Sequence, residues 1–398
     1  MELTLPLWLD PPLALGAPLS GDITADVCVI GAGLCGTAAA RALARDGVDV
    51  AWLEAGRVSG AATGRNAGFI LQGTAERYDR AVSLMGRDRA RKIHAWTLEN
   101  HARMAAVIEE DGIACGYRQG GSLQLAGSSL EEAELLASRD LLCEDGFEAE
   151  LIRGEALGPA LSGAGFELGV VLPRDGELHP ARFVRGAART AMAAGARLFE
   201  ETPVTHLDAS DAGAVKIQTP SGSVSCQVAL VCVNAAVGTL LPWFADKVDP
   251  VRGQMLATAP APRLFDRPIY ADHGFDYWRQ DPDGRVVLGG WRNLDPDAEV
   301  GFDEALHPAI QNKMSAFLAR FPGLAGVPVT HRWSGTMGFS RDGLPLVGAA
   351  PSAAGALVGA GFTGHGFGFA WLAGEALAQM ALEGAHPFCT DLSPRRLG

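Results

Sequence analysis

The stretch D-V-C-V-I-G-A-G-L-C-G-T-A-A-A-R-A-L-A-R-D-G-V-D-V-A-W-L-E, residues 26–54, decides the fold of this chain. It begins with an apolar run at 27–30 and ends with a second one at 48–53, and both runs have the composition of buried strands. An Ala-rich stretch of helical character separates them. The segment therefore predicts a strand, a tight turn, a helix and a second strand, in that order.

Three glycines shape the predicted turn. Gly31 permits the turn, Gly33 lets the backbone approach a pyrophosphate, and Gly36 allows the helix to pack closely on the strand. The helix N-terminus offers free N–H groups and a partial positive charge to an anion. Glu54 lies 18 residues beyond Gly36, where such folds hydrogen-bond a ribose hydroxyl. Glycines alone also mark ordinary turns, but together with both strands and this carboxylate they predict a dinucleotide site in a Rossmann-type α/β domain.

The composition is that of a globular enzyme with about two domains. The chain has 398 residues, 48% of them hydrophobic, and its mean hydropathy is +0.11. A net charge of -13 and the lack of a Lys/Arg-rich run argue against binding to nucleic acid or anionic lipid. We expect neither a signal peptide nor a membrane span, because no basic leader or long apolar run occurs. The seven scattered cysteines lack metal-type spacing, so we expect reduced cytoplasmic thiols and no metal site.

Two further Gly-rich segments are suited to a ligand. The loop at 55–68 follows the second strand, and it either wraps a ligand or is a plain surface loop. The turn at 359–368 directly precedes an apolar helix at 369–382 and so presents a second helix N-terminus. Two such termini suit a large ligand with separated acceptor groups, which favours FAD over NAD.

Residues 251–291 combine short predicted strands with many aromatic side chains. Aromatic residues in strands usually form a core. A pocket wall is the alternative, because His273, Tyr277 and Arg292 would be costly to bury without a polar ligand or partner.

The remaining pattern predicts ordinary elements. We expect a helix over 85–112, a strand over 200–207, and a hairpin that pairs 215–219 with 224–233.

With these residues assembled, the chain resembles the FAD-dependent amine and amino-acid oxidoreductases of the D-amino-acid oxidase type. This group holds glycine oxidase, monomeric sarcosine oxidase and gamma-glutamylputrescine oxidase, and the Gly-Arg-Asn element most resembles the last of these. The resemblance covers residues 19 to about 387. Its specific parts are G-A-G-L-C-G at 31–36 with Glu54, A-T-G-R-N-A-G at 62–68, R-G-Q at 252–254, D-G-R-V-V-L-G-G at 283–290 and G-F-T-G-H-G-F at 361–367.

The resemblance implies a Rossmann-type FAD domain of the glutathione-reductase-like kind, built from residues 19–84, 146–248 and 330–398. It implies a discontinuous α+β substrate domain, 85–145 and 249–329, whose antiparallel sheet covers the flavin. The cofactor contacts that it implies are Gly31, Gly33, Leu34, Cys35, Gly36, Glu54, Ala55, Arg57, Ala62, Thr63, Arg65, Asn66, Ala67, Gly68, Val204, Asn234, Ala235, Gly335, Gly361, Thr363, Gly364, His365, Gly366 and Phe367.

Departures from the family pattern bear on the substrate and the acceptor. Thr336-Met337 stands where glycine oxidase has a carboxylate-binding arginine, and Gly368 stands where sarcosine oxidase has a carboxylate-binding lysine. A simple alpha-amino acid therefore fits only if an arginine such as Arg252, Arg292 or Arg332 replaces them. Ser334 stands near the flavin-tethering cysteine of sarcosine oxidase, so we expect non-covalent FAD. Val287 stands at its oxygen-activating lysine, which leaves dioxygen or another electron acceptor open.

The function that we predict is oxidation of a C–N bond in a primary or secondary amine. Hydride equivalent would pass from the alpha carbon to flavin N5, and the imine would hydrolyse. The catalytic candidates are His273, Tyr277, Trp291 and His365, and the substrate-contact candidates are Arg252, Arg292, Met337 and Phe275. The alternatives are an amino-acid or imino-acid dehydrogenase or oxidase with an arginine-held carboxylate, a flavoprotein with a non-oxidative role, and an NAD-binding dehydrogenase.

Overall fold

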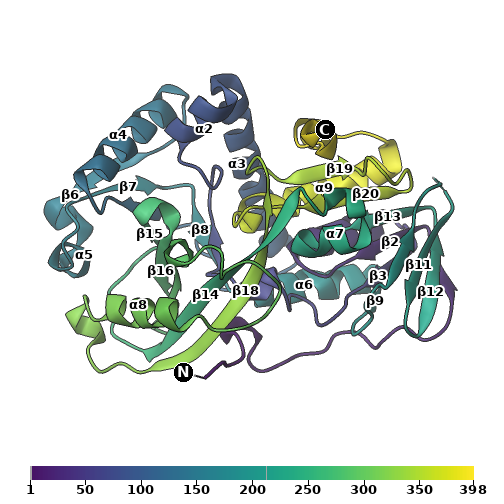
Figure 1. Ribbon diagram of the computed structural model, residues 1–398, viewed down its shortest axis with the longest axis horizontal. Coiled ribbons are helices and arrows are strands. Elements are labelled where there is room, and N and C mark those ends of the chain that lie inside the picture. Colours follow the sequence, from purple (N-terminus) through teal and green to yellow (C-terminus); the bar gives the residue numbers. More distant parts are fainter. Residues whose placement is uncertain (1, 212) are drawn as a thin grey trace.

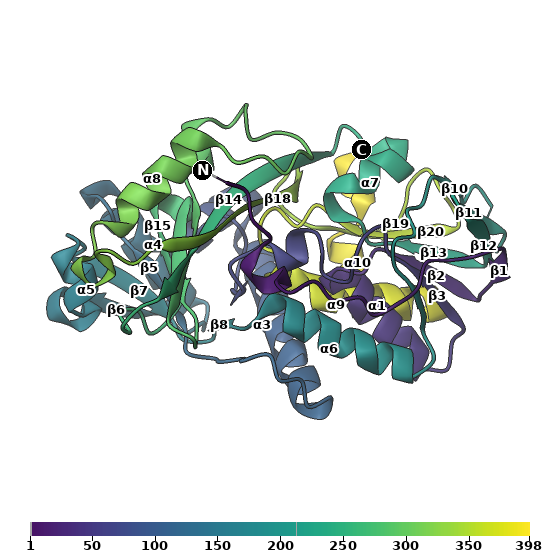
Figure 2. The same cartoon turned by 90° about the horizontal axis from the view of Figure 1, so that it is seen from below.

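The computed structural model describes residues 2–211 and 213–398 (Figures 1 and 2). A six-stranded sheet runs in the order β19-β20-β13-β2-β3-β9, with every neighbouring pair parallel except β19 and β20. This sheet confirms the predicted α/β class, because the two strands of the Gly-rich segment, β2 and β3, are parallel neighbours in it. Its strands are β2 (Val27–Ile30), β3 (Val50–Leu53), β9 (Arg197–Phe199), β13 (Val228–Val231), β19 (Leu346–Ala349) and β20 (Ala356–Ala360).

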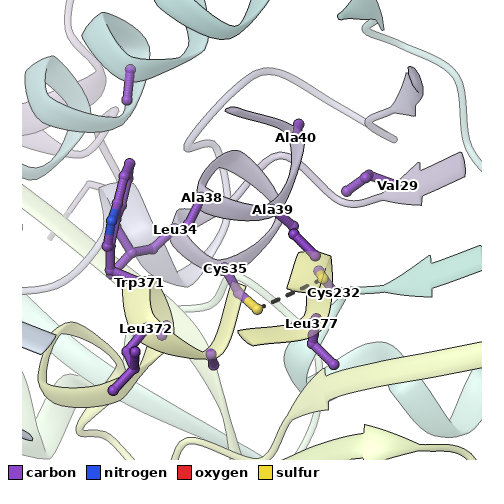
Figure 3. Packing of buried hydrophobic residues seen from close by; sticks show 14 of the residues in the cluster. Val29, Leu34, Cys35, Ala38, Ala39, Ala40, Cys232, Trp371, Leu372 and Leu377 are labelled. Atoms are coloured by element: carbon purple, nitrogen blue, oxygen red, sulfur yellow. Dashed lines mark hydrogen bonds between the residues drawn. The ribbon is translucent and has the colours of Figure 1, made fainter. Parts of the chain in front are cut away.

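Helices cover one face of this sheet. They are α1 (Leu34–Arg45), α6 (Pro180–Ala193) and α9 (Gly366–Glu383), and α1 packs against both of the others. The crossing of α1 and α9 is close because small residues line it: a Cβ on Gly374 would lie 2.2 Å from the carbonyl oxygen of Cys35. Figure 3 shows Ala38 and Ala39 of α1 in the same cluster as Trp371 of α9.

A four-stranded sheet covers the opposite face, in the order β1-β12-β11-β10. Val215, Ile217 and Val224 from this small sheet are buried in one cluster with Cys28 and Ile30 of the central strand. The six-stranded sheet therefore lies between a layer of helices and the four-stranded sheet. The small sheet consists of β1 (Ile23–Thr24), β10 (His206–Asp208), β11 (Val215–Thr219) and β12 (Gly222–Cys226).

An eight-stranded sheet forms the second half of the molecule, in the order β18-β14-β17-β16-β15-β5-β7-β6. Its pairs are antiparallel except β15 with β5, and α8 (Pro308–Leu318) packs on the face away from the first half. This is the predicted antiparallel sheet. Its strands are β5 (Ser122–Leu125), β6 (Glu150–Arg153), β7 (Leu168–Leu172), β14 (Val248–Pro260), β15 (Ile269–Ala271), β16 (Asp276–Gln280), β17 (Arg285–Gly290) and β18 (Val329–Ser340).

The other elements connect the two halves or cap them. The strand pair β4 and β8 lies between them, and the longest helix, α3, packs against α9. Among the described residues, no helix is both long and apolar enough to cross a membrane. These elements are α2 (Tyr78–Met85), α3 (Arg87–Glu110), α4 (Ser129–Glu144), α5 (Pro159–Gly163), α7 (Val237–Leu240), α10 (Pro387–Asp391), β4 (Phe69–Ile70) and β8 (Gly176–Glu177).

Two predictions for the region after α6 need correction. The strand predicted over 200–207 is wrong, because β9 ends at Phe199 and β10 begins only at His206. Glu200 lies at the break. Its carboxylate is buried and accepts hydrogen bonds from the backbone N–H groups of Leu15, Gly16 and Val58, so it binds neighbouring loops where a strand was predicted. The hairpin of β11 and β12 is confirmed, but the run predicted over 224–233 is divided between two sheets, because β13 enters the six-stranded one.

The helix predicted over 85–112 is confirmed as α3, which is two residues shorter at each end. Gly86 has a φ of +83° and separates α2 from α3, which ends at Glu110. The domain boundaries remain a prediction, and two observations cross them: β6 and β7 pair in the eight-stranded sheet, and α3 packs on α9.

Candidate active site

A large cavity of about 540 Å³ lies between the two halves. The first strand–helix turn, the loop after β3 and the N-terminus of α9 form one side, and the face of the eight-stranded sheet forms the other. The sequence segments predicted to bind a ligand therefore meet at one place.

The nucleotide turn has the shape that its glycines predict. Gly31 has a φ of +102°, and a Cβ there would lie 2.6 Å from the carbonyl oxygen of Cys232. A Cβ on Gly36 would lie 1.9 Å from the carbonyl oxygen of Gly31, so the helix could not approach with any larger residue. The first turn of α1 reaches the cavity at Leu34, whose N–H donates to Thr63 Oγ1 at 3.0 Å. The cavity wall thus includes a helix N-terminus, which favours an anion.

Glu54 lies at the cavity wall at the end of β3, as predicted. Its carboxylate accepts the N–H groups of Ala32 at 2.7 Å and of Gly56 at 2.8 Å. Burial raises its pKa above the ordinary value, although these two hydrogen bonds oppose the shift. Val204 lines the cavity beside it. This end therefore offers a fixed carboxylate and an apolar contact, the features that a nucleoside uses.

The loop at 62–68 is fixed by its own polar side chains. The Asn66 amide donates to the carbonyl oxygens of Ala62 and Thr63, and it accepts the N–H of Gly68. Arg65 donates to Gly60 O and lies 2.7 Å from the carboxylate of Glu304, so its charge is paired. These hydrogen bonds fix the shape of the loop at the cavity wall.

Two indoles bind consecutive carbonyls of the same loop. Trp8 Nε1 donates to Asn66 O at 2.6 Å, and Trp333 Nε1 donates to Arg65 O at 2.9 Å. A trans peptide directs its N–H opposite to its C=O. The N–H groups of Asn66 and Ala67 therefore point away from the two indoles. Arg65, Asn66 and Ala67 all line the cavity.

The second helix N-terminus also opens on the cavity. Helix α9 begins at Gly366, and Asn234 Oδ1 holds the preceding turn through the N–H groups of Gly361 at 3.0 Å and Phe362 at 3.4 Å. His365 lines the cavity, and its Nδ1 is buried without a hydrogen-bond partner in the described part of the chain. Burial lowers the pKa of His365 to about 4, so the ring is neutral at physiological pH.

The sheet contributes an aromatic wall with one cation. Tyr270 and Tyr277 stack at 5.6 Å between ring centroids, and burial raises the pKa of Tyr277 to about 12. The guanidinium of Arg292 lies between two rings, 4.6 Å from the centroid of Phe275 and 4.9 Å from that of Phe339. These side chains surround the space next to His365.

Several predicted site residues lie elsewhere. Trp291 is buried in the core behind the sheet, against Phe317, and does not line the cavity. Arg252 is also outside, because it pairs with the buried carboxylate of Glu299. His273 lines the cavity at its rim, where its Nε2 is 2.9 Å from Glu134. The predicted contacts Gly36, Arg57, Gly68, Ala235 and Gly361 do not line the cavity.

The remaining predicted residues line the cavity. They are Gly31, Gly33, Leu34, Cys35, Glu54, Ala55, Ala62, Thr63, Arg65, Asn66, Ala67, Val204, Asn234, Phe275, Tyr277, Arg292, Gly335, Met337, Thr363, Gly364, His365, Gly366 and Phe367. Sequence reasoning missed Tyr270, Phe339 and a group around Gln72 and His94. The density of aromatic residues pointed toward Tyr270, whereas no motif marks the others.

The geometry fits FAD. Glu54 would hold the ribose, the N-terminus of α1 would receive the pyrophosphate, and the N-terminus of α9 would face the flavin. The absence of side chains at Gly31 and Gly33 leaves room for a pyrophosphate to approach the backbone closely. The unpartnered His365 Nδ1 could form a hydrogen bond with the cofactor or a substrate.

Comparison with known proteins supports this assignment. A family model described as FAD dependent oxidoreductase matches residues 26–380. The chain is similar to gamma-glutamylputrescine oxidoreductase of Escherichia coli, with 28% identity over 93% of this chain and 86% of that one. It is equally similar to glycine oxidase of Bacillus licheniformis, with 28% identity over 90% of this chain and 93% of that one.

Solved structures show the same fold. The crystal structure of glycine oxidase from Geobacillus kaustophilus superposes with a TM-score of 0.78 at 22% identity, and it covers 93% of this chain and 98% of its own. L-proline dehydrogenase from P. horikoshii gives a TM-score of 0.77 at 21% identity over 95% of this chain and 98% of its own. The family match spans most of the sequence and agrees with a cavity built for FAD. This protein therefore belongs to the FAD-dependent oxidoreductase family.

Proposed function

We propose that this enzyme oxidises a C–N bond in an amine that also carries an anionic group, and that Arg292 holds that group. Bound FAD supplies the two-electron chemistry. The substrate class is thus an amino acid or a related amine with a carboxylate. It is not the simple amine that the absence of the family's carboxylate-binding arginine and lysine favours.

The observation that carries the proposal is the isolation of Arg292. Among the described residues, its side chain has neither an ion-pair nor a hydrogen-bond partner, although it is half-buried in the cavity. The other arginines of the cavity wall are neutralised, Arg65 by Glu304 at 2.7 Å and Arg77 by Glu134 at 2.8 Å. A cation that is partly withdrawn from water without a counter-charge is costly, and a substrate carboxylate would supply two acceptor oxygens for it.

The other arginines considered as anchors are already bonded. Arg252 pairs with Glu299, and Arg332 donates to Gln311 Oε1 at 2.7 Å and to Ser315 Oγ at 2.9 Å. Neither lines the cavity. Arg292 is thus the remaining candidate of the three.

Arg292 also sets the charge around the reacting amine. Its positive charge acts on both Tyr277 and His365, each of which is neutral because burial raises the pKa of the tyrosine and lowers that of the histidine. A nearby cation and a low dielectric both favour the unprotonated form of a bound amine. The uncharged amine has the lone pair that oxidation requires, so the site selects the reactive form.

The electron acceptor is a separate question. Val287, which stands at the position of the oxygen-activating lysine in the family pattern, is buried in an apolar cluster with Ala257 and Trp333. Among the described residues no lysine lines the cavity. These observations favour an acceptor other than dioxygen, and we expect air to reoxidise the reduced enzyme slowly.

An anaerobic screen tests the substrate class. Amines and amino acids are added to the purified holoenzyme, loss of the visible flavin band is followed, and air is then readmitted. We expect reduction by carboxylate-bearing amines, and we expect Arg292→Met to weaken their apparent affinity by about 10- to 100-fold, because a hydrogen bond to a charged group is worth roughly 1.5–3 kcal/mol.

The matched control is Arg332→Met, which removes an arginine of strand β18 outside the cavity. It should leave the affinity unchanged. Equal affinities for Arg292→Met and wild type would contradict the Arg292 anchor, and reduction by simple amines alone would return the assignment to an amine oxidoreductase. Absence of reduction by every amine and amino acid would favour the non-oxidative alternative.

A further inference from the structure

The cavity extends beyond the aromatic wall, along the face of the eight-stranded sheet. Tyr270 on β15 pairs with Gln124 on β5, and β7 follows β5 in the sheet. Gln124 and Leu172 of these strands line the cavity. Helices α2 and α4 pack on each other, and α4 packs on β7, so they roof this part of the sheet (Figure 1).

We call this extension the distal compartment. Its apolar lining consists of Tyr78, Ala81, Leu135, Leu142 and Leu172, which all belong to one buried cluster. Interiors of proteins are normally packed without voids, and a cavity that continues into such a cluster is shaped to receive a ligand rather than to stabilise the fold.

One polar pair faces this apolar lining. His94 Nε2 and Gln72 Oε1 lie 3.2 Å apart, and both residues line the cavity. Their other polar atoms, Gln72 Nε2 and His94 Nδ1, are buried without a hydrogen-bond partner in residues 2–211 and 213–398. The side chains are only 7% and 3% exposed, so bulk water does not satisfy these atoms. With His94 Nε2 donating to Gln72, the pair presents the two N–H donors of the Gln72 amide and one free acceptor, His94 Nδ1.

The Gln72–His94 pair is neutral. Burial lowers the pKa of His94 to about 4, so its ring carries no charge at physiological pH. The nearby carboxylate of Asp175 is occupied, because it accepts the N–H of Gln72 at 2.8 Å and the hydroxyl of Ser122 at 2.6 Å. A charged ligand group would find no counter-charge at the Gln72–His94 pair. A neutral group that both accepts and donates would satisfy both free atoms.

We propose that the distal compartment binds the tail of an extended substrate, and that Gln72 and His94 hydrogen-bond a neutral polar group on that tail, a hydroxyl or a carboxamide. This inference rests on the proposed function, since the substrate is anchored at Arg292 and its tail runs past Tyr270. Buried donors and acceptors of this kind discriminate strongly against analogues that lack the matching group.

Binding of unreactive carboxylates tests the proposal without turnover. The holoenzyme is titrated with straight-chain carboxylates from acetate to octanoate and with their ω-hydroxy counterparts, and the change in the visible flavin spectrum gives each Kd. We expect the Kd to fall about fourfold for each added methylene until the compartment is full. We expect one ω-hydroxy acid to bind more tightly than the plain acid of the same length.

Two variants and one control assign the effect to the compartment. Leu135→Trp fills it and should abolish the dependence on chain length while acetate binds as before, and Leu130→Trp, an exposed position on the same helix, should change nothing. Gln72→Leu should remove the preference for the hydroxyl group and leave the Kd of hexanoate unchanged. Equal flavin content and circular dichroism show that each variant is folded.

The outcomes separate this proposal from the one on which it rests. If acetate binds but longer acids bind no more tightly, the distal compartment is not a subsite and the proposal is overturned. If no carboxylate binds, the Arg292 anchor fails, and n-butylamine and n-octylamine are compared under anaerobic conditions instead. A lower Kd for octylamine that Leu135→Trp removes would then support the compartment, and equal values would overturn it.

Discussion

Replacement of Trp8 by Phe tests whether the N-terminal segment holds the cofactor loop. Trp8 is 4% exposed, and its Nε1 donates to Asn66 O at 2.6 Å. The ring also lies 4.9 Å from that of His179 and 5.0 Å from the guanidinium of Arg279, measured to ring centroids. Trp8→Phe keeps an aromatic ring at this position but removes the indole N–H.

The expected loss follows from the carbonyl left behind. A buried acceptor without its donor costs about 1–3 kcal/mol. Leu9 seats the same segment on the loop, because a Cβ on Gly64 would lie only 2.6 Å from Leu9 Cδ2. We therefore expect the free energy of unfolding to fall by about 1–3 kcal/mol, and we expect the Kd for FAD to rise by about 5-fold, the equivalent of roughly 1 kcal/mol. Trp8→Ala would also lose the ring contacts and should cost about 3–5 kcal/mol.

Urea unfolding of the apoprotein and the holoprotein, together with FAD titration of the apoprotein, measures both effects. Trp243→Phe is the matched control, since Trp243 is partly buried against Phe244 and makes no indole hydrogen bond among the described residues. The reasoning would be refuted if Trp8→Phe and Trp243→Phe bound FAD equally well. A loss of stability with an unchanged Kd would show that Trp8 supports the fold without positioning the loop.

Three further changes test other parts of the structure. Gly36→Ala should abolish FAD binding, because the new Cβ would lie 1.9 Å from a backbone oxygen. Gly163→Ala is the control and should bind FAD normally, because the space around Gly163 is open. The flavin content of the purified proteins measures the difference. Glu54→Gln should weaken FAD binding about tenfold or more, because both N–H groups lose a charged acceptor and one of them faces the new amide NH2. Titration of the apoprotein measures this, and an unchanged Kd would contradict the ribose assignment. Burial lowers the pKa of His101 to about 4, so between pH 4 and 6.5 the unfolded chain binds a proton that the folded chain does not, and stability falls as the pH falls. His101→Gln should therefore reduce the slope of unfolding free energy against pH by about 1.4 kcal/mol per unit, and an unchanged slope in urea titrations would contradict it.

The nucleotide turn could be predicted because its requirements are local. A side chain at position 36 would clash with the carbonyl of Gly31, five residues away, and one at position 31 would clash with the backbone that follows the neighbouring strand β13. The position of Glu54 follows from the length of one strand–helix–strand unit. The N-terminus of α9 was predictable for the same reason, since a Gly-rich turn directly precedes an apolar helix. In each case short-range backbone geometry restricts the choice of residue, so the residue reveals the geometry.

The distal compartment could not be predicted because nothing local marks it. Gln72 lies in a loop after β4 and His94 on α3, and their partnership depends on how α2, α3 and α4 pack over the sheet. Neither residue belongs to a motif, and a buried histidine on a helix is most often a satisfied core residue. Their importance appears only when the unpartnered atoms and the cavity are seen together.

Arg252 and Arg292 show what separates a structural cation from a ligand-binding one. Both lie on or beside central strands of the same sheet, and the sequence offers both as carboxylate anchors. The loop after Arg292 folds back so that the N–H of Arg252 binds Glu299 O and its guanidinium binds the carboxylate of Glu299. The same loop gives Arg292 no acidic partner and leaves it between two phenyl rings that face the cavity. The path of residues 293–305 therefore decides which arginine is free. Replacing Glu299 by Gln should remove the charge partner of Arg252 but leave its hydrogen bonds to Ala298 O and Asp303 O. Arg252 should then stay outside the cavity, and anaerobic flavin reduction should show no gain in substrate affinity.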